Sequence, residues 1–213
     1  MQEVARGIGL DNRIGSKFLN AGPGYGGSCF PKDTMALVKT AQDFGAPLRL
    51  VETTVAVNEQ RKRAMARKVF QALGGDVRGR TIAVLGRTFK PNTDDMREAP
   101  SLSIIQALQD GGARIRAYDP KGIEQARTML DNVVFGEGPY EIAEGADALV
   151  VVTEWDAFRA LDFTRLRQLM ARPVLVDLRN VYRREEIQRH GFHYVSVGRP
   201  LEDVALPFVE AAQ

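Results

Sequence analysis

The first third of the chain shows the spacing of apolar residues that is typical of helices. A helix is predicted from Pro31 to Phe44, and Gly45 ends it. A second helix is predicted from Leu48 to Leu73, because this stretch has neither Gly nor Pro and its apolar residues recur every four positions. A helix of about 25 residues spans about 40 Å, enough to bridge two domains or to form a dimer seam. Before Pro31, only a short segment near Gln2–Gly7 reads as helical.

After residue 80 the pattern changes to short apolar strands that alternate with amphipathic helices. Strands are predicted at Thr81–Gly86, Arg114–Tyr118, Asn132–Phe135, Ala148–Thr153, Val174–Asp177 and Phe192–Val197. Helices are predicted between them at Ser101–Gln109, Lys121–Leu130, Pro139–Glu144, Phe163–Met170 and Arg183–His190. This alternation predicts an α/β fold with a doubly wound parallel sheet. We expect two domains, a helical region over residues 1–75 and an α/β domain over residues 76–213.

Composition narrows the choice of partners and compartment. The 213 residues carry 29 basic and 27 acidic side chains, and this net charge of +2 gives no reason to expect a nucleic-acid or membrane partner. No apolar run approaches the roughly 18 residues of a transmembrane helix, and the N-terminus does not read as a signal peptide. A single cysteine excludes an internal disulfide framework, and no Cys/His cluster suggests a metal site. The cytoplasm is the expected compartment.

The single cysteine lies in the sequence GPGYGGSCFPKD, residues 22–33, where four glycines precede the thiol. Pro31 has a φ angle suited to a first helical turn, so Cys29 is expected just before a helix N-terminus. The positive end of that helix and Lys32 both favour the thiolate, which is the nucleophilic form. A lone cysteine is most often a small buried apolar residue, but such a position needs neither the glycines nor the polar neighbours. We interpret Cys29 as a catalytic nucleophile.

The turn after the first predicted strand, Gly86-Arg87-Thr88, lacks the G-x-G-x-x-G pattern of dinucleotide-binding sheets. Asp119, at the end of the second strand, is therefore interpreted as a strand-end cap before Pro120 rather than as a ribose-binding acid. Ligands of doubly wound sheets bind beyond the carboxyl ends of the strands. Lys90 and Arg97 follow the first strand in that region, and we expect them to contact phosphate.

Two long motifs resemble a known family. Residues 22–33, preceded by Arg13-Ile14-Gly15 and Phe18-Leu19-Asn20-Ala21-Gly22, resemble the active-site segment of the UDP-glucose/GDP-mannose dehydrogenases. The sequence FKPNTDDMREAPS, residues 89–101, resembles that family's C-terminal signature. The resemblance covers essentially the whole chain and implies a central helical region followed by a Rossmann-like, UDP-binding domain. It also implies that these residues begin inside the central region, without the family's N-terminal NAD-binding domain.

The resemblance assigns roles to individual positions. The implied catalytic residues are Cys29 and Asp33, and the implied contacts to the NAD cofactor are Lys32 and Arg97. Arg13 is implied to reach the substrate site of a neighbouring subunit. The other implied substrate contacts are Phe18, Leu19, Asn20, Ala21, Gly22, Gly26, Lys90 and Arg179. Residues 154–158 also resemble the family, but Trp155 is interpreted as a packing residue, and His190 and His193 as exposed or structural.

The implied reaction is the NAD-dependent, four-electron oxidation of UDP-glucose to UDP-glucuronate. The intermediate aldehyde is held on Cys29 as a thiohemiacetal and then as a thioester, and Asp33 orients or deprotonates the water that releases the acid. The isolated chain is expected to be inactive. Two alternatives stay open: a dehydrogenase of GDP-mannose or a UDP-N-acetylhexosamine, and a noncatalytic nucleotide-sugar-binding and dimerisation fragment. The expected partners are the UDP-sugar and a second copy of the chain, in a homodimer or a larger homo-oligomer.

Overall fold

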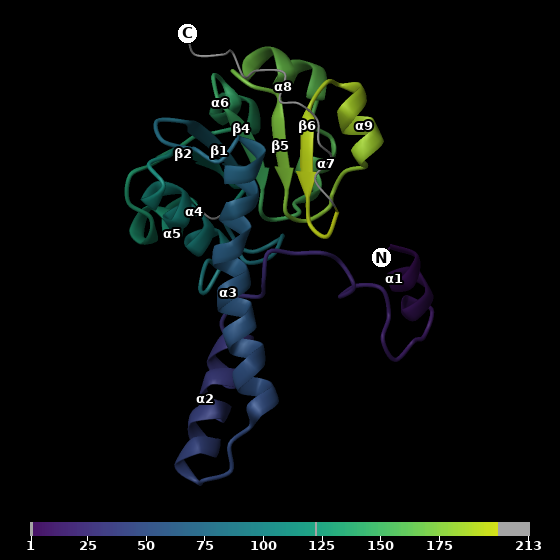
Figure 1. The fold of residues 1–213 in the computed structure, drawn as a ribbon, viewed down its shortest axis with the longest axis vertical. Coiled ribbons are helices and arrows are strands. Elements are labelled where there is room, and N and C mark those ends of the chain that lie inside the picture. Colours follow the sequence, from purple (N-terminus) through teal and green to yellow (C-terminus); the bar gives the residue numbers. More distant parts are fainter. Residues whose placement is uncertain (1, 122, 200–213) are drawn as a thin grey trace.

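The computed structural model describes residues 2–121 and 123–199, and its centre is a six-stranded sheet (Figure 1). The strands are β1 (Thr81–Leu85), β2 (Arg114–Tyr118), β3 (Val133–Phe135), β4 (Ala148–Val151), β5 (Val174–Asp177) and β6 (His193–Ser196). They lie in the order β3-β2-β1-β4-β5-β6, and each neighbouring pair is parallel. The predicted doubly wound parallel sheet is confirmed.

Helices cover both faces of this sheet. One face is covered by α3 (Arg49–Ala72), α4 (Pro100–Asp110) and α5 (Ile123–Met129). The other face is covered by α6 (Pro139–Ala143), α7 (Asp156–Arg159), α8 (Phe163–Leu169) and α9 (Arg184–Arg189). Strands β1, β4 and β5 are buried along their whole length. They read as continuous apolar runs in the sequence because neither face of these strands meets water.

A helical hairpin projects from the sheet. It is made of α2 (Cys29–Asp43) and the first half of α3, and it forms the lower part of the molecule in Figure 1. The second half of α3 joins the core through Met65, Ala66 and Val69. One continuous helix therefore serves both of the expected domains. The boundary between residues 75 and 76 stays a prediction, and residues 200–213 of the expected second domain lie outside the described residues.

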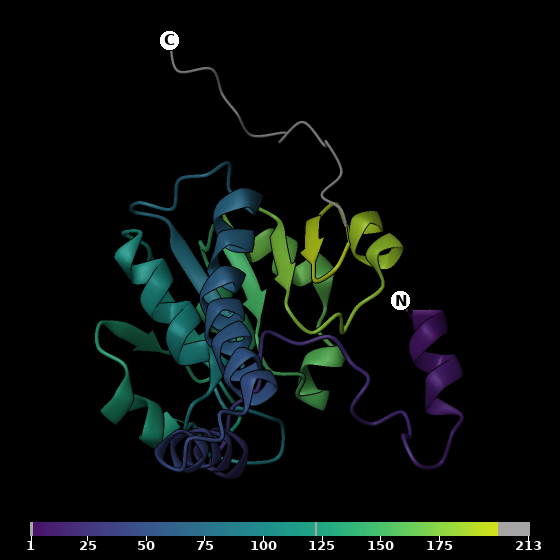
Figure 2. The same cartoon turned by 60° about the horizontal axis from the view of Figure 1, so that its bottom comes forward.

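The N-terminal segment lies apart from the rest of the molecule. Helix α1 (Gln2–Gly9) is joined to α2 by residues 10–28, which run as an extended arm across the end of the sheet. Both Figure 1 and Figure 2 show α1 well separated from α2 and α3. The arm brings the glycine-rich loop to the body of the molecule and leaves its own first part exposed.

Two local predictions were wrong. Cys29 was expected just before a helix, but α2 begins at Cys29 itself, with Ser28 as the N-cap. Pro31 is compatible with this start because a first helical turn does not use its N–H groups in helical hydrogen bonds. The sequence pattern also missed α7, since a four-residue helix is too short to show a helical period. The predicted helix over residues 121–130 is α5, and residue 122 lies outside the described residues.

Candidate active site

The two sequence motifs pack directly against each other beyond the carboxyl end of β1. The Gly27 N–H donates to the Arg97 carbonyl oxygen at 2.8 Å. A Cβ atom at Gly26 would stand 2.3 Å from the Glu98 carbonyl oxygen. Gly27 has a φ of +88°, and a Cβ there would stand 2.8 Å from the Phe89 ring. Only glycine permits these approaches, so the glycines serve contact between the two motifs as well as any contact with a ligand.

Cys29 is exposed at the first position of α2. Its Sγ lies 3.6 Å from Ser28 Oγ. As the first residue of α2, Cys29 lies at the positive end of the helix dipole, which favours negative charge. Asp33 follows four residues later on the same face of α2. The exposed Lys32 and Asp33 place their charged groups 3.4 Å apart. An accessible thiol is thus combined with a carboxylate and a cation within one helical turn.

Arg97 brings a second cation close to Cys29. Its guanidinium donates to the Asp95 carboxylate at 3.0 and 2.8 Å. This hydrogen bonding raises the pKa of Arg97, and the charge of the nearby Cys29 thiolate adds to the rise. The same hydrogen bonding lowers the pKa of Asp95, and the charge of Lys90 contributes to that shift. The second motif therefore holds positive charge beside the thiol.

Arg179 joins the ends of β4 and β5 to the glycine-rich loop. Its Nε donates to the Val152 carbonyl oxygen at 2.9 Å and also lies 2.9 Å from a carboxylate oxygen of Glu154. Burial lowers the pKa of Arg179, and the charges of Glu154 and Asp177 oppose this shift. A Cβ atom at Gly22 would stand only 2.8 Å from Nη1 of Arg179. The guanidinium therefore lies against the loop that precedes Cys29.

Lys90 stands at the edge of the same cluster. It is exposed, and its Nζ lies 5.1 Å from the centre of the Phe89 ring. The carbonyl oxygen of Phe89 accepts a hydrogen bond from Arg179 at 3.4 Å. The structure therefore gathers Gly22, Gly26, Cys29, Lys32, Asp33, Lys90, Arg97 and Arg179 around the loop that carries the thiol.

Sequence reasoning missed three residues of α3 that hold this loop. Asn58 hydrogen-bonds the backbone of Tyr25, Arg61 donates to the Gly22 carbonyl oxygen, and Lys62 pairs with Glu98. The helical period assigned these positions to a helix but said nothing about their partners. The burial of a lysine on a helix is visible only in the folded chain, so no sequence signal was available for Lys62.

The remaining predicted substrate contacts lie on the arm. The Arg13 side chain is 89% exposed and pairs with Asp11, and Phe18 is 93% exposed. Asn20 donates to the Lys17 carbonyl oxygen at 3.2 Å, and Leu19 and Ala21 are half-buried. Within this chain the structure does not bring Arg13 and Phe18 to Cys29. Their predicted roles need either a second subunit or a ligand.

The turn after β1 packs closely against the rest of the sheet. A Cβ atom at Gly86 would stand 2.5 Å from the Cβ of Thr153, so the backbone of the turn lies directly against the residue that follows β4. The Asp119 carboxylate accepts hydrogen bonds from the backbone N–H groups of Arg87 and Thr88, at 2.6 and 3.2 Å. The side chain of Arg87 is fully buried. The interpretation of Asp119 as a structural cap is confirmed.

Other candidate chemistry is limited. Within residues 2–121 and 123–199, no group of three or more His, Cys, Asp or Glu side chains could hold a metal ion. In the same part of the chain, no helix has the length and apolar character needed to cross a bilayer.

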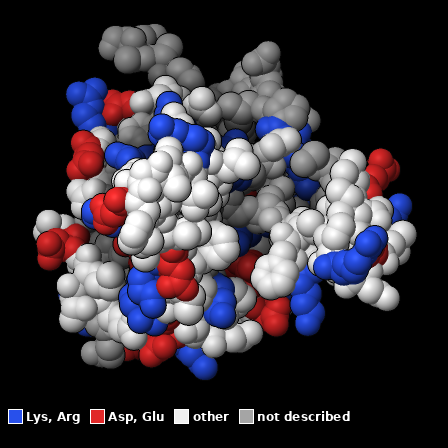
Figure 3. Space-filling view, turned by 90° about the horizontal axis from the view of Figure 1, so that it is seen from below, with Lys and Arg blue, Asp and Glu red and all other residues white. Residues whose placement is uncertain are grey.

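Trp155 is buried in the core, as predicted, and its Nε1 donates to Asp119 at 3.2 Å. Figure 3 shows basic and acidic side chains interspersed on the face seen from below.

Family models match both halves of this site. The central domain of the UDP-glucose/GDP-mannose dehydrogenase family matches residues 1–60, and the UDP binding domain of the same family matches residues 83–184. The chain belongs to this family. Cys29 lies in the first match, and Lys90, Arg97 and Arg179 lie in the second. The candidate active site of this family member therefore forms where the central domain meets the UDP binding domain.

Named relatives and solved structures agree with this assignment. UDP-glucose 6-dehydrogenase of Rhizobium meliloti is 66% identical over 94% of this chain, and the match covers 46% of that protein. The Bacillus subtilis UDP-glucose 6-dehydrogenase TuaD is 44% identical over 94% of this chain and 43% of its own length. The chain thus spans about half the length of these relatives.

Solved structures show the same fold. A UDP-glucose dehydrogenase from Pyrobaculum islandicum superposes with a TM-score of 0.76 at 36% identity, over 86% of this chain and 41% of that one. An NDP-N-acetyl-D-galactosaminuronic acid dehydrogenase from Methanosarcina mazei superposes with a TM-score of 0.80 at 26% identity, over 93% and 44%. The fold is therefore shared by dehydrogenases of different nucleotide sugars.

Proposed function

We propose that this chain is part of a UDP-glucose 6-dehydrogenase, which oxidises UDP-glucose to UDP-glucuronate in the cytoplasm. The observation that carries this proposal is the direct contact between the loop of Cys29 and the loop of Lys90 and Arg97. That contact places an accessible thiol beside cations suited to phosphate. The 66% identity to the Rhizobium meliloti enzyme supports UDP-glucose as the sugar nucleotide.

In this proposal, different residues of the chain bind the substrate, form the covalent intermediate and release the product. Arg179, Lys90 and the main chain of residues 18–26 bind the UDP-sugar. The Cys29 thiolate attacks the C6 aldehyde to give a thiohemiacetal, which oxidation converts to a thioester. Asp33 orients or deprotonates the water that hydrolyses the thioester, and so releases UDP-glucuronate and the free thiol. NAD would be the hydride acceptor for both oxidations, and the exposed Lys32 and Arg97 would contact it.

The identity of the sugar is the first alternative to test. The Methanosarcina mazei structure has the same fold, although its name assigns it an N-acetylated sugar. Calorimetric titration of the chain with UDP-glucose, UDP-N-acetylglucosamine and GDP-mannose separates the candidates. We expect UDP-glucose to bind most tightly, and binding of GDP-mannose alone would contradict the proposal.

A second copy of the chain is the proposed partner. The first half of α3 contacts α2, and its residues Leu50 and Val57 are 86% and 54% exposed. They are seven positions apart and so lie on one face of the helix. On α2, Met35 and Phe44 are also exposed, at 61% and 83%. A projecting helical hairpin with these exposed apolar side chains suits a homodimer seam. If the chain binds a nucleotide sugar but takes no part in catalysis, dimerisation through this surface would be its second function.

A further inference from the structure

One turn of α3 holds the loop that leads to Cys29. Arg61 and Lys62 follow Asn58 by three and four residues, so both side chains lie on the same side of the helix as Asn58. Asn58 is 5% exposed and Lys62 is 2% exposed, although both are polar. Buried polar side chains are stable only when they are hydrogen-bonded, and each of these three has a partner in one of the two signature motifs, Lys62 pairing also with Glu59 on α3.

Asn58 clamps both backbone groups of Tyr25. Its Oδ1 accepts from the Tyr25 N–H at 2.8 Å, and its Nδ2 donates to the Tyr25 carbonyl oxygen at 3.1 Å. A carboxamide is suited to this contact because it carries a donor and an acceptor on one planar group. Gly24 has a φ of +140°, and a Cβ there would stand 2.9 Å from Asn58 Oδ1. The loop therefore lies flat against the helix.

Arg61 and Lys62 extend this clamp in two directions. The Nε and Nη2 of Arg61 donate to the Gly22 carbonyl oxygen at 3.0 and 2.7 Å. The Lys62 ammonium lies 2.8 Å from Glu59 and 3.4 Å from Glu98. Glu98 belongs to the second motif and has a φ of +51°, which is unusual for a residue other than glycine. The same turn of α3 thus holds the first motif at Gly22 and Tyr25, and the second at Glu98.

A glycine-rich loop has a particular need for such a clamp. Glycine loses more conformational freedom than any other residue when its backbone is fixed, so residues 22–27 would sample many conformations if they were unsupported. A loop that is already ordered binds its ligand without this entropy cost at the moment of binding. The clamp acts on the backbone and leaves the thiol of Cys29 accessible.

We propose that Asn58, Arg61 and Lys62 are positioning residues that preorganise residues 22–27 for the nucleotide sugar and thereby set the place of Cys29. This inference rests on the proposed function for its ligand. The order of residues 22–27, which is the structural part of this inference, can be measured without any ligand.

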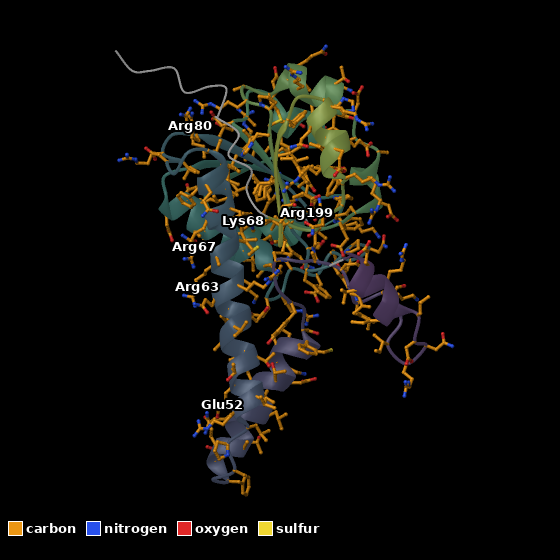
Figure 4. The ribbon with its side chains drawn as sticks, turned by 45° about the vertical axis from the view of Figure 1, so that its right-hand side comes forward. Glu52, Arg63, Arg67, Lys68, Arg80 and Arg199 are labelled. Carbon is orange, nitrogen blue, oxygen red and sulfur yellow. The ribbon has the colours of Figure 1, made fainter. Side chains whose placement is uncertain are left out.

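The test uses the 213-residue chain with matched variants of α3. Asn58→Ala removes both bonds to Tyr25, and Asn58→Asp keeps the shape but loses the donor. Gln60→Ala is the control, because it removes an exposed amide from the same turn. Arg67→Ala is the control for Arg61→Ala, because Figure 4 shows Arg67 on the side of α3 that faces away from the N-terminal arm. The readouts are amide exchange at Tyr25, the affinity for UDP-glucose, and the melting temperature.

We expect exchange at Tyr25 to accelerate about tenfold in Asn58→Ala, because its N–H loses a hydrogen bond, and to change little in Gln60→Ala. UDP-glucose should bind about tenfold more weakly to Asn58→Ala and Arg61→Ala than to their controls. Asn58→Asp still accepts from the Tyr25 N–H, but its carboxylate faces the Tyr25 carbonyl oxygen, so in affinity for UDP-glucose it should resemble Asn58→Ala more than the wild type. Asn58→Gln keeps both donor and acceptor and should recover part of the affinity.

The outcomes separate this inference from the proposed function. If exchange at Tyr25 in Asn58→Ala equals that in Gln60→Ala, the positioning role is overturned. Weaker binding with unchanged exchange, or a fall in affinity that merely follows the melting temperature, also overturns it. If the wild-type chain binds no UDP-glucose, the proposed function fails, and the exchange measurement still decides whether α3 orders the loop.

Discussion

Gly22, Gly26 and Gly27 each stand where a side chain would collide with a partner that the loop contacts. The partners differ in how easily they can move. At Gly22 the nearest atom is the end of the Arg179 side chain, at 2.8 Å from a built Cβ, whereas at Gly26 it is the Glu98 backbone oxygen, at 2.3 Å. A flexible guanidinium can shift by a few tenths of an ångström, but a backbone fixed in two motifs cannot. The cost of a methyl group should therefore differ between these positions.

Alanine substitution tests this ranking. We expect Gly26→Ala to destabilise the chain by about 1–3 kcal/mol, because the added methyl group forces the two motifs apart. Gly22→Ala should cost less, and Gly138→Ala should cost the least, because nothing lies within 4 Å of its Cβ position and only its N-cap place on α6 is affected. Denaturant unfolding of the three variants gives the comparison. Equal stability of Gly26→Ala and Gly138→Ala would show that the motifs do not pack as described.

The thiol of Cys29 gives the second prediction at this scale. Its test uses an enzyme in which this chain is joined to an NAD-binding half, such as that of the Rhizobium meliloti relative; we call this the completed enzyme. Cys29→Ser should bind UDP-glucose within a few-fold of the wild type, because the shape of the loop is kept. Its conversion to the acid should fall by about three orders of magnitude or more, since a serine alkoxide is far less accessible than a thiolate. Cys29→Ala should abolish covalent capture, and full conversion by Cys29→Ala would leave the thiol with a structural role only.

At the scale of elements, α3 links every part of the proposed function. Its second half is part of the core of the sheet, its middle turn holds the loop before Cys29, and its first half carries the exposed apolar face. The absence of Gly and Pro from residues 48–73 predicted this helix within one residue at each end. The pattern could not assign the three tasks, because each depends on contacts with residues far along the chain.

The proposed dimer seam can be tested on this helix. We expect the wild-type chain to be a dimer in light scattering, and the double variant Leu50→Glu, Val57→Glu to be a monomer with an unchanged fold. Both side chains are exposed in the single chain, so charge there should oppose association without disturbing the core. Met129→Glu, on α5, is the control, because this exposed apolar residue lies away from α3. A wild-type chain that remains monomeric at high concentration would contradict the seam.

Much of the sheet was predictable because its strands are buried on both faces and its helices are amphipathic. β2 and β5 were predicted with the bounds that the structure shows. The start of α2 was misplaced because Pro31 marks the first turn of a helix without fixing its first residue. The glycines and charges around Cys29 indicated the thiol, and the place after the first strand indicated Lys90 and Arg97. The resemblance added Arg179. Neither the pattern nor the resemblance indicated Asn58, Arg61 or Lys62, whose contacts follow from tertiary packing alone.

At the scale of the whole molecule, the candidate active site forms where the residues of the two family matches meet, and the turn after β1 lacks the G-x-G-x-x-G pattern. The turn after β1 is closed by Asp119 and by the contact of Gly86 with Thr153. The residues matched in the Rhizobium meliloti enzyme make up 46% of its length. The 213 residues contain the reactive thiol but not the G-x-G-x-x-G pattern that binds NAD, so the thiol is separated from the pattern for binding the hydride acceptor.

This separation predicts that the purified 213-residue chain makes no NADH from UDP-glucose and NAD. We expect no rise in absorbance at about 340 nm, where NADH absorbs and NAD does not. Addition of the NAD-binding half of the relative should restore production of NADH. Turnover by the chain alone would show that its own residues bind and position the cofactor without the G-x-G-x-x-G pattern.

The central claim, that Cys29 carries the sugar as a covalent intermediate, is tested most directly by intact-protein mass spectrometry of an Asp33→Asn variant. In the completed enzyme with UDP-glucose and NAD, loss of the Asp33 carboxylate should slow hydrolysis of the thioester more than its formation. We expect the mass of the chain to rise by one UDP-glucuronyl group, at Cys29 and with release of NADH. The same variant carrying Cys29→Ala should show no adduct. A fully active Asp33→Asn, Cys29→Ala enzyme, or an adduct on another residue, would contradict the account.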